Sequence, residues 1–109
     1  MKSMGEMSQE QLEAIMGLIV NAGNAKSDAM EAIQAAKNGG FEEADEKLKA
    51  AEAALLEAHH AQTKLLTAEA NGEALPITLL TIHSQDHLMT SITFNDLAKE
   101  VIDVYRRLG

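Results

Sequence analysis

Hydrophobic residues recur along the first third of the chain at the three-to-four-residue spacing of an amphipathic helix. This stretch begins after Ser8, which with Gln11 three residues later has the form of an N-terminal capping box. It ends at the glycine pair 39–40, so the pattern predicts a helix over about residues 8–38. The expected buried positions of this helix are Leu12, Ile15, Met16, Ile19, Gly23, Ala29, Met30, Ile33 and Ala36.

A second helix is predicted from Phe41 to about Glu69, where Asn71-Gly72 ends the pattern. Its histidines His59 and His60 point about 100° apart, so we expect one near the buried face and the other exposed. The expected buried face is rich in alanine and consists of Ala44, Leu48, Ala51, Leu55, Ala58, Gln62, Leu65 and Leu66.

A third helix is predicted from Pro76, since proline is tolerated in a first helical turn, to about Leu108. Three helices of about 30 residues joined by short loops predict an all-α fold, an up-down-up antiparallel three-helix bundle. The N-terminal half of the third helix is apolar almost all the way round. Two neighbouring helices cannot cover such a surface, so we expect other protomers to cover the rest.

Three chemically active side chains interrupt this apolar helix. His83, Asp86 and His87 fall within about one third of the helix circumference and therefore share a face. We expect that face to be buried, because the same rotation brings apolar residues onto it: Leu79, Leu80, Phe94, Leu97, Val101, Val104 and Leu108. A buried carboxylate is costly, so Asp86 should have a partner, a cation or a wet pocket.

Small residues also occur within the first helix. Gly17 and Gly23 each cost roughly 1 kcal/mol relative to alanine in a helix, which predicts close helix approach or room for a ligand.

Composition limits the class of protein. A chain of 109 residues with one proline fits a single domain over residues 1–109, with residues 1–7 expected to form a disordered tail. There is no cysteine, so disulfides and thiolate metal sites are excluded. The net charge of −8 argues against nucleic acid as a partner. Neither a signal peptide nor a membrane-spanning run is visible, so we expect a cytoplasmic protein without membrane insertion.

The residues around His83 leave three functions open. A histidine pair at i, i+4 with Asp86 as a third ligand would suit a zinc-dependent hydrolase, although the glutamate that usually follows the first histidine is missing. A neutral imidazole could instead accept a phosphoryl group and later release it, supported by Gln85, His87 or a neighbouring chain. The third reading is a helical scaffold whose histidines are satisfied by hydrogen bonds.

Three stretches, in this order along the chain, carry a resemblance that favours one of these functions. They are IMGLIVNAGNAKS at 15–27, EAHHAQTKL at 57–65 and HSQDHLMT at 83–90. They resemble the enzyme IIA component of the lactose/cellobiose/chitobiose branch of the bacterial phosphoenolpyruvate-dependent sugar phosphotransferase system. The similarity covers nearly the whole chain, from about Gln11 to Leu108.

This resemblance implies a phosphotransferase that works through a phosphohistidine. His83 matches the phosphorylated histidine, which is charged through Nε2 by the phosphocarrier protein HPr and discharged to a cysteine of the partner enzyme IIB. Gln85, His87, His59 and Gln62 match recurring positions near the active groove. For His59 and Gln62, an interhelical hydrogen bond is as plausible a role as a direct one. The choice of sugar is left to the membrane partner.

The resemblance also implies an assembly. Protomers would form a homotrimer, a nine-helix bundle, in which Asp86 meets its two symmetry mates and shares a divalent cation, expected to be Mg²⁺. A carboxylate on a buried face suits such an axis, because three converging charges repel unless a cation is bound. Ser84 stands where relatives commonly have alanine, and its hydroxyl is expected to lie within reach of the phosphoryl group.

Overall fold

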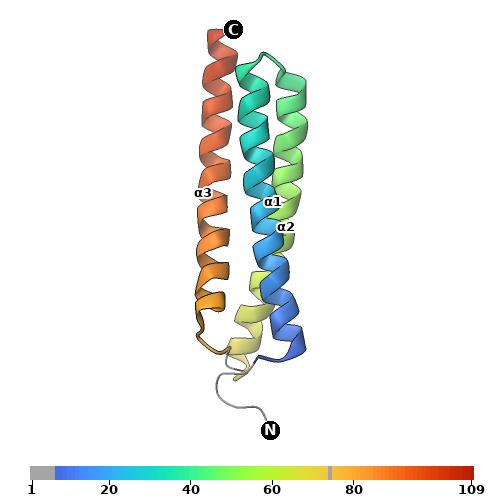
Figure 1. The fold of residues 1–109 in the computed structure, drawn as a ribbon, viewed down its shortest axis with the longest axis vertical. Coiled ribbons are helices and arrows are strands. Elements are labelled where there is room, and N and C mark those ends of the chain that lie inside the picture. Colours follow the sequence, from blue (N-terminus) through green and yellow to red (C-terminus); the bar gives the residue numbers. More distant parts are fainter. Residues whose placement is uncertain (1–6, 74) are drawn as a thin grey trace.

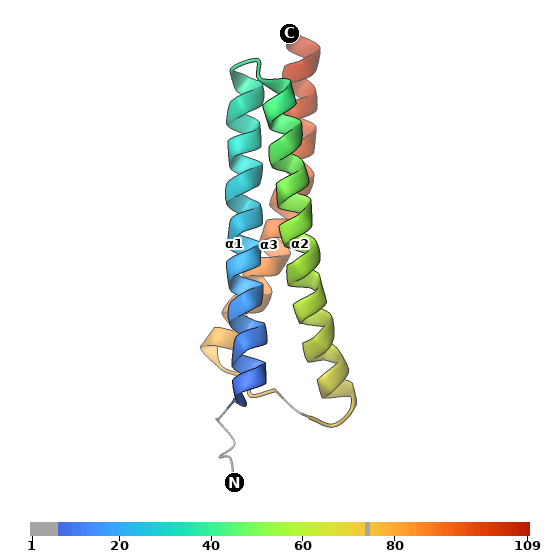
Figure 2. The same cartoon turned by 90° about the vertical axis from the view of Figure 1, so that its right-hand side faces the viewer.

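Three long helices lie side by side in the computed structural model, which describes residues 7–73 and 75–109. They are α1 (Gln9–Lys37), α2 (Phe41–Ala70) and α3 (Leu79–Leu108). Helices α1 and α3 run in the same direction and α2 runs against both, as Figure 1 and Figure 2 show. The molecule measures 61 × 19 × 19 Å. The predicted up-down-up bundle is therefore confirmed for one chain.

The predicted start of α1 is confirmed, and the predicted start of α3 is wrong. Ser8 and Gln11 form the capping box, each side chain accepting the other residue's backbone N–H at 3.0 Å. In α3 the N-cap is Thr78, whose hydroxyl accepts the backbone N–H of Thr81 at 3.2 Å. Because this cap sets the first turn, Pro76 lies before the helix, in the connection from α2.

The chain ends of the helices behave largely as expected. Gly39 and Gly72 take positive φ angles of 83° and 89°, which lets the chain leave α1 and α2 sharply. The tail expected over residues 1–7 lies outside the described residues except for Met7. That residue packs, half-buried, against the core around Ile15 and Leu18.

Alanines bring α1 and α2 close together. Many of the fully buried residues of these helices are alanines, Ala25, Ala29 and Ala32 on α1 and Ala44, Ala51 and Ala58 on α2, and the larger Ile15 and Leu18 of α1 are buried at one end. Of the two glycines of α1, Gly23 makes the predicted close approach, to His87 of α3, whereas nothing lies within 4 Å of the Cβ position at Gly17. The predicted burial of Leu12, Met16 and Met30 is wrong, because the alanine face takes the interface and leaves these larger side chains 38%, 44% and 46% exposed.

Helix α3 packs on the other two helices through a face that combines small and polar residues with the apolar Leu88 and Ile102. Its buried residues are Thr81, Ser84, Leu88, Ser91, Asn95, Ala98 and Ile102. Ser91 Oγ donates to the carbonyl oxygen of Ala22 at 2.9 Å and ties this face to α1. Of the apolar residues predicted to be buried, Leu80 and Phe94 are half-buried and pack against the core. The others are exposed within one chain: Leu79, Leu97, Val101, Val104 and Leu108.

These apolar residues form an exposed stripe along α3, which we call the α3 stripe. Its members are Leu79, Ile82, Met89, Leu97, Val101, Val104 and Leu108, and they are 38–84% exposed. The expectation that this side of α3 is buried is therefore wrong for the single chain. None of the helices, over the residues that the structure describes, is long and apolar enough to cross a membrane.

Candidate functional site

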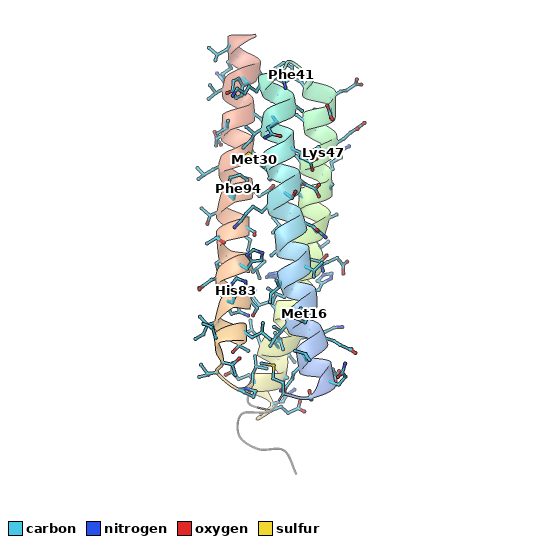
Figure 3. All side chains as sticks on the ribbon, in the orientation of Figure 1. Met16, Met30, Phe41, Lys47, His83 and Phe94 are labelled. Carbon is cyan, nitrogen blue, oxygen red and sulfur yellow. The ribbon has the colours of Figure 1, made fainter. Side chains whose placement is uncertain are left out.

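His83 and His87 lie one turn apart on α3 with their rings stacked. The ring centroids are 5.3 Å apart and the ring planes are inclined by 26°. His83 is exposed and His87 is half-buried. Figure 3 places His83 in the N-terminal half of α3. One imidazole is thus open to an incoming group while the other supports it from the protein side.

The backbone of α1 passes close to the His87 ring. A Cβ atom added at Gly23 would lie 3.3 Å from His87 Nε2, tighter than most side-chain contacts. One turn further along both helices, Lys26 Nζ lies 3.5 Å from the hydroxyl oxygen of Thr90. Because α1 and α3 run in parallel, these two contacts follow each other one helical turn apart.

This environment lowers the pKa of His87 below its ordinary value of 6.5. Burial is the largest cause, followed by the positive charge of Lys26 and then the neighbouring His83. All three disfavour a second positive charge beside Lys26. His87 is therefore a neutral imidazole near neutral pH. In a neutral imidazole one ring nitrogen donates a hydrogen bond and the other accepts one.

Helix α2 reaches the site through Gln62. Its Nε2 donates an interhelical hydrogen bond to Gln85 Oε1 at 2.8 Å. Gln85 follows His83 by two residues in the sequence. The expectation that one of the two adjacent α2 histidines lies near the buried face is wrong, since His59 and His60 are both exposed. Ala58 occupies the buried position instead, and the next two residues turn away from it by about 100° and 200°.

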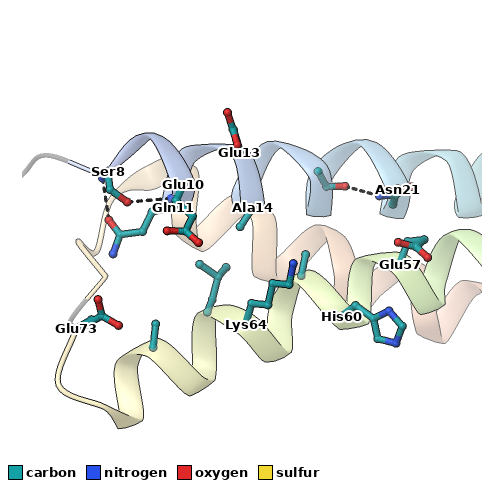
Figure 4. Close-up of a pocket in the computed structure, with 14 residues that line it drawn as sticks. Ser8, Glu10, Gln11, Glu13, Ala14, Asn21, Glu57, His60, Lys64 and Glu73 are labelled. Atoms are coloured by element: carbon teal, nitrogen blue, oxygen red, sulfur yellow. Dashed lines mark hydrogen bonds between the residues drawn. The ribbon is translucent and has the colours of Figure 1, made fainter.

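His60 belongs to a different groove, shown in Figure 4. This groove of about 510 Å³ opens between α1 and α2, where Figure 2 shows the end of α2 diverging from α1. Asn21, Glu57 and Lys64 line it together with His60, and Gly17 leaves it room on the α1 side. His60 is thus separated from the His83–His87 pair, and nothing in the groove adds to the chemistry at His83.

Asp86 lies on the exposed side of α3, between the stripe residues Ile82 and Met89. It also lines a groove of about 360 Å³ between α2 and α3, together with Gln62 and Gln85. Within residues 7–73 and 75–109, no three or more His, Cys, Asp or Glu side chains are grouped so that they could hold a metal ion. The intrachain zinc site considered from the sequence therefore does not form.

Ser84 is fully buried, and its hydroxyl donates to the carbonyl oxygen of Thr81 at 2.7 Å. The expectation that this hydroxyl reaches a phosphoryl group is wrong, because Ser84 faces the core while His83 faces outward. The structure instead adds Gly23, Lys26 and Thr90 to the surroundings of His87. All three were visible in the sequence, but only the offset between α1 and α3 brings them to the histidines.

Comparisons with known proteins indicate one family. A family model described as "PTS system, Lactose/Cellobiose specific IIA subunit" matches residues 13–106. The lichenan-specific phosphotransferase enzyme IIA component of Bacillus subtilis is 47% identical over 102 residues, which are 94% of this chain and 93% of the relative.

Solved structures agree as well. The cellobiose-specific enzyme IIA from Bacillus anthracis is 49% identical and superposes with a TM-score of 0.90, covering 97% of this chain and 96% of that one. The IIA(Chitobiose) chain of the Escherichia coli IIA(Chitobiose)–HPr complex is 39% identical with a TM-score of 0.80, covering 93% of this chain and 98% of that one. This chain, with its paired histidines on the third helix of the same fold, belongs to the lactose/cellobiose-specific IIA family of the phosphotransferase system.

Proposed function

We propose that His83 is the residue that carries the phosphoryl group in this chain. As a IIA component the chain is a phosphotransferase that acts through a phosphohistidine, a carrier step of sugar uptake. The observation that carries the assignment to His83 is its exposed ring, stacked on the half-buried ring of His87. His59 and His60 are exposed on α2 without such a partner ring among the described residues.

The first transfer is a displacement at phosphorus. The lone pair of neutral His83 Nε2 attacks the phosphorus of a donor phosphohistidine, the new N–P bond forms, and the donor N–P bond breaks with its electron pair going to the donor ring. The second transfer repeats this chemistry with a cysteine thiolate as nucleophile and His83 as leaving group. In both steps little bond making falls to the protein, so positioning and hydrogen bonds carry the catalysis.

HPr and IIB are the proposed donor and acceptor. A relative with the same fold forms a complex with HPr, which supports HPr as the donor. IIB, with its cysteine, is the acceptor that the family assignment suggests. An exposed His83 suits this exchange, because two different proteins must reach the same ring nitrogen in turn.

His87 and the Gln62–Gln85 pair are proposed as supports of the site. His87 Nε2 lies against α1 at Gly23, which fixes the ring that stacks under His83. The 2.8 Å bond from Gln62 orients the amide of Gln85 on α3. For Gln62 the interhelical bond is the proposed role, and His59 is left with no contact to His83 that would support a direct one.

The α3 stripe supports a homotrimer. Apolar side chains in a row along a whole helix, exposed in one chain, are what three copies would bury against each other in a nine-helix bundle. Asp86 lies on this side of α3, so three copies would bring three carboxylates together. Oxygen ligands of that kind suit a divalent cation such as Mg²⁺, which would relieve their repulsion. We assign Asp86 to stability rather than to phosphoryl transfer.

The assignment of His83 is tested by phosphorylation with phosphoenolpyruvate, enzyme I and HPr, followed by intact mass measurement. The wild type should gain one phosphoryl group that is labile in acid and stable in base, and His83→Gln should gain none. His60→Gln is the matched control and should behave as the wild type. Phosphorylation of His83→Gln to the wild-type level would overturn the assignment.

A further inference from the structure

We propose that Lys26 of α1 supplies the positive charge that stabilises the phosphoryl group on His83. The inference rests on the proposed function of His83 and adds to it a residue from another helix. Lys26 Nζ lies 3.5 Å from Thr90 Oγ1, on the side of α3 that carries His83 and His87. The sequence pattern alone gives no reason to connect this lysine with the histidines.

The geometry of the two parallel helices holds Lys26 at this place. Gly23 lies against the His87 ring, and one helical turn further along Lys26 contacts Thr90. Ser91, the residue after Thr90, bonds to the carbonyl of Ala22 and locks the same register. The base of the lysine side chain is therefore fixed by helix packing, while its ammonium group is held only by a long hydrogen bond at the surface.

Such a bond is easily exchanged for a better acceptor. The Thr90 hydroxyl already donates to the carbonyl of Asp86 at 2.8 Å and offers Lys26 a neutral oxygen at the limit of hydrogen bonding. Phosphoryl oxygens carry negative charge, and charge-assisted hydrogen bonds are shorter and stronger than neutral ones. The four-carbon stem of lysine allows the ammonium group to swing from Thr90 toward the histidine pair without moving the helices.

Charge balance gives this lysine its importance. The chain has a net charge of −8, so a phosphoryl group on its surface meets a repulsive field. The charge of Lys26 already acts on the histidine pair, because it contributes to the lowered pKa of His87. The same positive charge that adds to the effect of burial on His87 before transfer favours the negative phosphoryl oxygens during and after it.

The test compares rates of phosphoryl transfer in variants of the full chain. Lys26→Met removes the charge at nearly constant length, Lys26→Gln is a second neutral variant in case the first fails to fold, and Lys26→Arg restores the charge. Lys49→Met is the matched control, because it removes an exposed lysine in the N-terminal half of α2. Each variant is first compared with the wild type by circular dichroism and thermal midpoint, so that a folding defect is recognised.

Two donors separate the site from partner docking. Phospho-HPr presents a protein surface, whereas phosphoramidate is a small donor whose P–N bond breaks to release ammonia as His83 Nε2 bonds to phosphorus. We expect Lys26→Met to be phosphorylated about tenfold more slowly than the wild type by both phosphoryl donors. The effect is smaller than for a buried hydrogen-bond donor, because Lys26 lies at the surface. Lys26→Arg should recover most of the rate, and Lys49→Met should match the wild type.

Each other outcome has a distinct meaning. Equal rates for Lys26→Met and wild type overturn the proposal, and so does a loss that Lys26→Arg shares in full, since that would be a packing effect. A loss with phospho-HPr but not with phosphoramidate also overturns it and assigns Lys26 to docking. If the wild type takes up no phosphoryl group on His83 from either donor, the proposed function itself fails.

Discussion

His87 Nε2 lies 3.3 Å from the point where a Cβ atom on Gly23 would stand. Glycine costs about 1 kcal/mol relative to alanine in a helix interior, so its presence there has a structural cost. The missing side chain is what allows the backbone of α1 to press against the ring. The position of His87, and through ring stacking the surroundings of His83, therefore depend on a residue that has no side chain of its own.

Gly23→Ala should separate stability from activity. The added methyl group favours the helix by about 1 kcal/mol but forces the His87 ring to move by a few tenths of an ångström. We expect little change in the thermal midpoint and a several-fold slower phosphorylation of His83. Gly17→Ala is the matched control, since nothing lies within 4 Å of its Cβ position, and it should raise the midpoint without slowing transfer. Equal transfer rates in the two variants would contradict the argument.

The lowered pKa of His87 predicts a loss of stability in mild acid. In the unfolded chain burial and the charge of Lys26 are absent, so His87 titrates near its ordinary 6.5 and binds a proton before the folded form does. The stabilisation is therefore complete above pH 6.5 and is lost as the pH falls toward the lowered pKa.

Urea unfolding at several pH values between about 7 and 5.5, above the range where carboxylates titrate, measures this loss. The midpoint of the wild type should fall with pH, and that of His87→Asn should fall less. His60→Asn, at an exposed position in the other groove, should keep the wild-type dependence. The idea is wrong if His87→Asn and the wild type lose stability in parallel.

Leu97→Glu should break the proposed homotrimer. Leu97 is 59% exposed in one chain, where a surface substitution would cost little. In a trimer formed through the α3 stripe, three glutamates would be buried close together, so we expect dissociation in sedimentation velocity. The released chain should also melt at a lower temperature, because the face that holds α3 includes the buried polar residues Ser84, Ser91 and Asn95 among its apolar contacts.

Gln34→Glu adds the same charge at an exposed position of α1 and is the control for this experiment. It should keep the sedimentation behaviour of the wild type. A Leu97→Glu chain that sediments as the wild type would remove the α3 stripe from the assembly.

Helix periodicity and capping residues predict most of the fold. The capping box at Ser8 and the glycines at 39 and 72 place the ends of α1 and α2 within about a residue, since these signals act through local backbone bonds. The face that each helix buries is less predictable. Along α1, Met16 and Ala22 both fit a helical spacing, and only the presence of an alanine-rich partner decides that the smaller residue is buried.

The candidate site divides in the same way. His83 and His87 are four residues apart on one helix, so their proximity follows from the sequence. The contacts of Gly23 and Lys26 with α3 depend on the offset between two helices that the chain connects only through α2. The sequence also does not predict that the face of α3 with His83 is exposed in one chain. An apolar stripe on α3 fits burial within a chain as well as burial between chains.

Asp86→Leu should make the protein independent of divalent cations. If three Asp86 carboxylates meet in a trimer, removing the cation leaves like charges close together, so a chelator should lower the thermal midpoint of the wild type. Leucine continues the apolar row between Ile82 and Met89 and removes the repulsion, so the variant should melt at the same temperature with and without chelator. Asp103→Leu, at an exposed position paired with Arg107, should stay as cation-dependent as the wild type. Asp86→Leu should also be phosphorylated at the wild-type rate, because Asp86 is assigned to assembly, and an Asp86→Leu trimer that melts as the wild type does on cation removal would contradict the shared site.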